Sequence, residues 1–141
     1  MEPLILVVVL ILLQALYFGI EVGRARQRLG IEAPAVSGND KFDRYFRAHQ
    51  NSLEQLIVFL LAILVAAYLA YSITCVVCGV FNLLGRAIYF RSYIKEPRKR
   101  TLGFVLSFFS TVILIMTSLL SSILNFFNNF LKPDSAELAI L

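Results

Sequence analysis

Apolar residues are gathered into three long stretches, which are separated by two polar segments rich in arginine and lysine. Residues 4–20 are interrupted only by Gln14 and Gly19, and residues 55–85 and 101–131 contain no charged side chain. A helix that crosses the hydrocarbon core of a bilayer needs about 20 mostly apolar residues. Each stretch is long enough to do so, and the sequence therefore predicts an all-α integral membrane protein.

The middle stretch, residues 55–85, is too long for a single span. As one helix it would measure about 46 Å, whereas the hydrocarbon core is about 30 Å thick. It forms either one badly mismatched span or a hairpin of two spans that turns near residues 71–74. The basic residues decide between these alternatives, because the positive-inside rule gathers Lys and Arg on one side of the membrane.

Three spans would put the two basic segments on opposite sides, with equal numbers of cations in each, whereas four spans put every Lys and Arg except Lys132 on the same side. We therefore predict a single domain over residues 1–141 with four transmembrane helices, at approximately residues 4–23, 42–71, 74–95 and 102–131. Both basic connections are expected in the cytoplasm. Pro97 is expected to end or bend the third helix, because proline cannot donate the backbone hydrogen bond.

Composition supports this interpretation and excludes several others. The chain is 59% hydrophobic and only 16% charged, which is more apolar than a soluble domain usually is. Its net charge of +4 is a weak indication of nucleic-acid binding, but the orientation of the spans explains the basic residues better. Cys75 and Cys78 lie in apolar sequence, where thiols are poorly ionised and serve as packing residues. His49 is the one histidine, so neither a histidine-rich metal site nor a metal cofactor is expected.

Two polar helical faces lie where the basic segments meet the apolar stretches. Spacings of four and three residues put side chains on one face of a helix. Ionisable groups near hydrocarbon are costly unless they are paired or face a cavity, so both faces are functional candidates. The first face consists of Arg47, Asn51 and Glu54, and the second of Asn82, Arg86, Tyr89 and Tyr93.

These faces also have plainer explanations. Arginine and tyrosine near a membrane surface often snorkel or form an aromatic belt. Glu54 has the alternative of an ion pair with Arg47 or Arg86. Taken alone, the two faces indicate only a small anionic or zwitterionic ligand.

Four segments of the chain form a combined pattern: residues 33–38 (APAVSG), 42–54 (FDRYFRAHQNSLE), 85–93 (GRAIYFRSY) and 98–104 (RKRTLGF). Together they resemble the MAPEG superfamily, the membrane-associated proteins in eicosanoid and glutathione metabolism. The pattern is closest to the branch that contains microsomal glutathione transferase two and leukotriene-C synthase. Three positions depart from the leukotriene-C synthase pattern. Gln27 replaces an arginine, His49 replaces a glutamine and Gln55 replaces a tyrosine.

This resemblance implies a homotrimer of four-helix subunits that binds glutathione, as a co-substrate, between neighbouring subunits on the basic side. Arg100 matches the arginine that activates the glutathione thiol in the family. Arg26 would reach into the site from a neighbouring subunit. The remaining glutathione-binding positions that the resemblance implies are Arg47, Asn51, Glu54, Tyr89 and Tyr93.

The chemistry of glutathione suits these residue types. Glutathione carries two carboxylates and one ammonium group, and arginine binds carboxylates through two parallel hydrogen bonds. Glu54 can take the ammonium group. A nearby guanidinium lowers a thiol pKa from about 8.5 and so favours the nucleophilic thiolate. Arg100 can do this without accepting a proton, because arginine stays charged.

The sequence thus predicts a membrane-bound glutathione S-transferase that conjugates glutathione to hydrophobic electrophiles arriving from the lipid, with reduction of lipid hydroperoxides as a further activity. The alternative is a non-enzymatic lipid-binding or scaffold member of the same superfamily. The host membrane is expected to be a bacterial inner membrane or, in a eukaryote, one of endoplasmic-reticulum type. The expected partners are further copies of the chain, glutathione, membrane lipid and the apolar substrate, with no nucleic acid. Arg28, Lys41 and Lys95 are assigned to membrane orientation alone.

Overall fold

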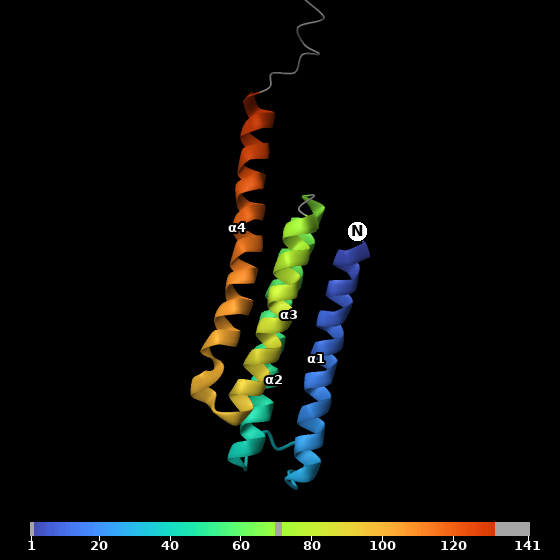
Figure 1. The fold of residues 1–141 in the computed structure, drawn as a ribbon, viewed down its shortest axis with the longest axis vertical. Helices are drawn as coiled ribbons and strands as arrows, with labels where there is room; N and C mark the ends of the chain where they lie inside the picture. The colour runs from blue at the N-terminus through green and yellow to red at the C-terminus, as the bar shows by residue number, and fades with distance from the viewer. Residues whose placement is uncertain (1, 70–71, 132–141) are drawn as a thin grey trace, which may run out of the picture.

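The computed structural model describes residues 2–69 and 72–131, and these residues are almost entirely helical (Figure 1). The elements are α1 (Glu2–Arg28), α2 (Asp40–Tyr68), α3 (Ser72–Lys95), the short 3-10 helix η1 (Pro97–Arg100) and α4 (Thr101–Leu131). Four helices are long and apolar enough to cross a membrane. The predicted all-α, four-helix membrane architecture is therefore confirmed.

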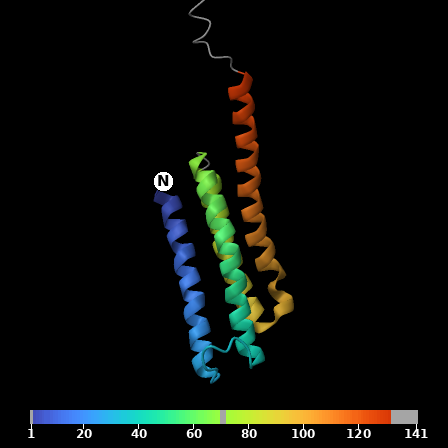
Figure 2. The same ribbon diagram turned by 180° about the vertical axis from the view of Figure 1, so that it is seen from behind.

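The two basic connections lie at the same end of the bundle. Figure 1 shows the α1–α2 connection and the turn from α3 through η1 to α4 together, opposite the amino end of α1. The view from behind shows the same arrangement, with α4 extending past the other helices at the far end (Figure 2). We call the end that carries the two connections the basic end.

Local sequence signals define the helix ends near the first connection. Gly30 adopts φ +65°, a left-handed conformation that glycine accepts without strain, and the Ile31 amide donates to the Arg26 carbonyl oxygen at 3.1 Å. This turn ends α1 after Arg28, so the helix includes the polar residues after position 23 and is longer than the predicted 4–23. The Asn39 side chain caps α2 by accepting from the Lys41 amide at 2.9 Å, so α2 begins before the predicted residue 42.

The predicted turn of the hairpin was placed too late in the chain. α2 ends at Tyr68 and α3 begins at Ser72, so Ile73 and Thr74 belong to a helix rather than to the turn. The predicted end of the second helix, residue 71, lies outside the described residues. Hydropathy cannot locate a turn inside a stretch that is apolar throughout, which explains the error. Pro97 does end the third helix as predicted, because α3 stops at Lys95.

Helix α3 lies centrally and contacts α1, α2 and α4. The main core includes Ile11, Phe59, Ile63 and Leu114, one or more from each of α1, α2 and α4, and Cys75 of α3 is fully buried among them. Most outward-facing side chains on all four helices are large and apolar. Such a surface suits a lipid environment.

The backbones of α3 and α4 approach closely at two glycines near the basic end. A Cβ atom added to Gly85 would lie 2.7 Å from the Ser107 amide nitrogen, and one added to Gly103 would lie 2.6 Å from the Gly85 carbonyl oxygen. Membrane helices commonly use small residues to permit such contact. The glycine pair therefore fixes the distance between the last turns of α3 and the first turns of α4.

Replacing Gly103 by alanine tests this contact. Gly103→Ala is expected to lower the thermal unfolding midpoint in detergent, because the new methyl group meets backbone atoms that cannot rotate away, at a cost of about 1–3 kcal/mol. Gly23→Ala is the matched control, since a Cβ at this helical position meets nothing within 4 Å. It should leave the midpoint unchanged or raise it slightly. Equal losses in both variants would contradict the close approach.

Candidate functional site

A recess of about 340 Å³ opens between α2, α3 and the start of α4 at the basic end. Four of the positions to which the family resemblance gives a role in catalysis or glutathione binding line this recess: Asn51, Glu54, Tyr89 and Arg100. They come from three separate elements, α2, α3 and η1. The other lining residues are Gln55, Arg86, Thr101 and Phe104.

A hydrogen bond between α2 and α3 forms one wall of the recess. The Asn51 Nδ2 atom donates to the Tyr89 hydroxyl oxygen at 2.9 Å. Tyr89 is buried, and its ring lies 5.6 Å from that of Tyr93 one turn further along α3. Tyr93 does not line the recess but packs against the Tyr89 ring.

The turn between α3 and α4 brings Arg100 back against α3. The Glu96 amide donates to the Ser92 carbonyl oxygen at 2.8 Å, and the Lys99 amide donates to the Glu96 carbonyl oxygen at 2.9 Å, so the turn is tight. As a result the Arg100 guanidinium lies over the Tyr93 ring, 5.1 Å from its centroid. This is the distance of a cation–π contact, and it orients the guanidinium beside the recess.

Glu54 and Arg100 have no ion-pair partner within the described ranges 2–69 and 72–131, where the ion pairs involve Glu21 and Glu96 instead. The alternative in which Glu54 pairs with Arg47 or Arg86 is therefore not found. A carboxylate and a guanidinium thus face one hollow without neutralising each other. That arrangement suits a ligand that carries both signs of charge.

Arg86 is a buried cation that the sequence analysis put on the second polar face but not among the glutathione-binding positions. Its Nη2 atom donates to the Ser52 Oγ at 2.5 Å and its Nη1 atom to the Gln55 Oε1 at 3.4 Å, while the guanidinium lies 4.2 Å from the Tyr89 ring centroid. Only 5% of the residue is exposed, and its Nε atom has no hydrogen-bond partner. A buried guanidinium is costly without an anion. Its helical spacing from Tyr89 indicated that both side chains share one face of α3, but spacing does not distinguish a buried arginine from a snorkelling one.

Two predicted site residues lie elsewhere in this chain. Arg26 donates to the carbonyl oxygens of Glu32 at 3.2 Å and Ala35 at 2.7 Å, and it lies over the Phe42 ring. It thereby holds the α1–α2 connection in place. Arg47 is exposed one helical turn before Asn51 and does not line the recess.

His49 lies outside the recess. A Cβ added to Gly19 would lie 3.5 Å from the His49 Nε2 atom, so His49 packs where α1 and α2 meet. Over the part of the chain that the structure describes, no group of three or more His, Cys, Asp or Glu residues is arranged to hold a metal ion.

A sequence model described as the MAPEG family matches residues 4–120, from the first turn of α1 well into α4. The chain belongs to the MAPEG family. The match includes every element that lines the recess, and the resemblance inferred from four short segments is confirmed.

Three relatives illustrate where this chain stands within the MAPEG family. Microsomal glutathione S-transferase 2 of Homo sapiens is 31% identical over 124 residues, which cover 88% of this chain and 84% of the relative. An uncharacterized protein of Synechocystis is 39% identical over 102 residues, covering 72% of this chain and 74% of its own length. Leukotriene C4 synthase of Rattus norvegicus is 36% identical over 90 residues, covering 64% of this chain and 59% of its own length.

Removing the Tyr89 hydroxyl tests the wall of the recess. Tyr89→Phe leaves the Asn51 amide without its acceptor and is expected to lower the free energy of unfolding by about 1–2 kcal/mol. Thermal unfolding in detergent measures this. Tyr17→Phe is the control, because the half-exposed Tyr17 makes no hydrogen bond through its hydroxyl among the described residues. If the two variants unfold alike, the Asn51–Tyr89 bond does not stabilise the wall.

Proposed function

We propose that this MAPEG protein is a membrane-bound glutathione S-transferase, with glutathione as co-substrate and hydrophobic electrophiles as acceptors. The observation that carries the proposal is the convergence of Asn51, Glu54, Tyr89 and Arg100 on one recess at the basic end. The family membership supports it, since relatives include microsomal glutathione S-transferase 2.

In this proposal the charges of the recess match those of the tripeptide. Glu54 takes the glutathione ammonium group, and the buried Arg86 offers a cation to a carboxylate. Arg47, one turn from Asn51, can close on a second carboxylate from the rim. Charge-assisted hydrogen bonds of this kind are roughly twice as strong as neutral ones.

Arg100 then stabilises the glutathione thiolate. The thiol proton leaves to water, and the guanidinium offsets the negative charge on sulfur. The thiolate attacks the electrophilic carbon, the new sulfur–carbon bond forms, and the leaving group departs with the electron pair of the broken bond. Tyr93 acts as a positioning residue, because it holds the Arg100 guanidinium through its ring.

We further infer that the functional unit is a homotrimer in which Arg26 completes the site of a neighbouring subunit. Arg26 lies on α1 and does not line the recess of its own chain, which supports a role in another copy. The basic end is assigned to the cytoplasm, of either a bacterial inner membrane or an endoplasmic-reticulum-type membrane, because cytoplasmic loops carry the excess of Lys and Arg.

Thiolate formation is the direct test of the enzyme. Wild-type protein in detergent, mixed with glutathione in a stopped-flow instrument, should show thiolate ultraviolet absorbance. Arg100→Ala should lose this signal, and Arg100→Lys should recover part of it because the charge returns. Arg98→Ala removes the same charge from an exposed position in η1 and should keep the signal.

The absence of any thiolate signal in the wild type would contradict the transferase. Calorimetry then distinguishes the alternatives: saturable binding of glutathione supports the enzyme, whereas binding of fatty acids alone supports the non-enzymatic lipid-binding member. Addition of a lipid hydroperoxide in the same assay measures the peroxidase activity.

Mixed trimers test the shared site. Co-expression of Arg26→Ala and Arg100→Ala chains, each inactive alone, should restore activity, because some interfaces then combine an intact Arg26 with an intact Arg100. The matched control pairs Arg26→Ala with Arg26→Ala in two differently tagged chains, which should stay inactive. Failure of the Arg26/Arg100 mixture to recover activity would mean that each subunit forms its site alone.

A further inference from the structure

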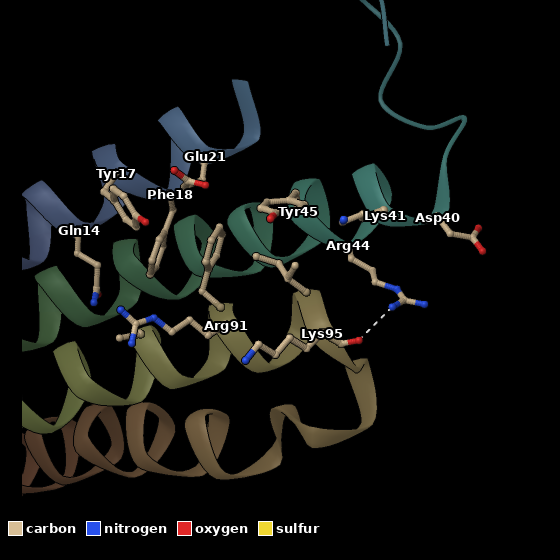
Figure 3. A pocket seen from close by; sticks show the side chains of 13 residues that line it. Gln14, Tyr17, Phe18, Glu21, Asp40, Lys41, Arg44, Tyr45, Arg91 and Lys95 are labelled. Carbon is tan, nitrogen blue, oxygen red and sulfur yellow. Dashed lines mark hydrogen bonds between the residues drawn. The ribbon is translucent and has the colours of Figure 1, made fainter. Parts of the chain in front are cut away.

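A second hollow lies on the other side of α3 from the recess. It has a volume of about 700 Å³ and opens between α1, α2 and α3 at the basic end (Figure 3). We call it the α1–α3 groove. Its walls include Gln14 and Phe18 of α1, Arg44 of α2, and Ala87, Arg91 and Lys95 of α3.

The groove is separate from the glutathione recess. Tyr89 lines the recess and Arg91 lines the groove, and they are two residues apart on α3. Since each residue of an α-helix turns the side-chain direction by about 100°, these two side chains point to nearly opposite sides of α3. The residues that line only the groove have no place in the proposed transfer reaction.

One wall of the groove is aromatic and firmly packed. The Phe18 ring stacks on the Phe90 ring with their centroids 4.0 Å apart, and Tyr45 meets Phe90 edge-on at 6.2 Å. Further from the basic end, the Gln14 Nε2 atom donates to the Leu83 carbonyl oxygen at 2.9 Å, which joins α1 to α3. This wall offers apolar surface along the direction of the helices.

The lining of the groove carries an excess of cations. Lys41, Arg44, Arg91 and Lys95 face only two carboxylates, Glu21 and Asp40. Glu21 is already paired, because its carboxylate lies 2.6 Å from an Arg24 guanidinium nitrogen and 3.9 Å from one of Arg28.

Two of these cations are available to a ligand. Within the described part of the chain neither Arg91 nor Lys95 has an ion-pair partner. In Figure 3 the Arg91 side chain runs back along α3, away from Lys95 and toward the end of the groove where Gln14 lies. Arg44 donates to the Lys95 carbonyl oxygen at 3.2 Å, so its guanidinium is held at the rim. Arg91 and Lys95 are exposed near the basic end, where cations beside apolar helix surface attract anionic lipid headgroups.

We propose that the α1–α3 groove binds an anionic phospholipid. Its headgroup lies along the row of cations that runs from Arg44 through Lys95 to Arg91, and one acyl chain follows the aromatic wall past Ala87. A basic pocket between membrane helices is a recognised setting for anionic headgroups. A phosphodiester carries one negative charge shared by two unesterified oxygens, which these cations can bind, and the apolar wall gives the lipid an affinity that free phosphate lacks.

Lipid binding to purified, delipidated protein in neutral detergent tests this proposal without any glutathione. Native mass spectrometry follows titrations with dioctanoyl phosphatidylglycerol and, for comparison, dioctanoyl phosphatidylcholine. The wild type should bind the anionic lipid at least tenfold more tightly than the zwitterionic one. Arg91→Gln combined with Lys95→Gln should remove most of this preference.

Two further variants separate a specific groove from general attraction. Arg98→Gln combined with Lys99→Gln removes the same charge from exposed positions of η1 at the same end and should keep the preference. Ala87→Phe fills the groove without altering charge and should weaken binding of both lipids about tenfold. Thermal unfolding midpoints verify that each variant is folded, and because no glutathione is present the result is independent of the transferase proposal.

Several outcomes would overturn the assignment. These are equal affinity for the two lipids in the wild type, an equal loss in the Arg98/Lys99 variant, and unchanged binding in Ala87→Phe. Displacement of the phospholipid by octanoate at equal concentration would instead make the groove a carboxylate site. Displacement by inorganic phosphate would reduce it to a simple anion site.

Discussion

The close contact of α3 and α4 at Gly85 and Gly103 determines the geometry at the basic end. Because the two backbones touch there, the chain that joins these helices has room only for a tight turn, and η1 is that turn. This short helix brings the Arg100 guanidinium over the Tyr93 ring. The position of the proposed catalytic arginine thus depends on two glycines that lie three and fifteen residues away from it in the chain.

Helix α3 separates two polar hollows of different character. On one side, Tyr89 and the buried Arg86 face a recess that also contains a carboxylate, which suits a small ligand with both signs of charge. On the other side, Arg91 and Lys95 face a larger groove with an aromatic wall, which suits an amphiphile. Residues only two positions apart therefore line different hollows, because the helix turns them to opposite faces.

The sequence was sufficient for the architecture because hydropathy and charge act over whole segments. Apolar length gave the spans, and the position of Lys and Arg put both connections at one end. The hairpin turn was misplaced, since no charge or cap interrupts the apolar stretch around Ile73 and Thr74. Local signals such as the Asn39 cap and Gly30 explain the extended ends of α1 and α2 only once the backbone is known.

The site was predictable to a smaller extent. Helical spacing put Asn51 with Glu54, while the role of Arg100 came only from the family resemblance. The inward direction of Arg86 and the assembly of the α1–α3 groove depend on contacts between segments far apart in the chain, such as Gln14 with Leu83. Lys95 was assigned to orientation alone, because a sequence does not tell which side chains share a hollow.

The cations of the recess are both arginines, and this has a consequence for its electrostatics. A guanidinium spreads one positive charge over a planar fork of N–H donors. Arg86 and Arg100 therefore present the recess with a directional pattern of donors as well as with positive charge. An anion that enters the recess is oriented by these donors in addition to being attracted by the charge.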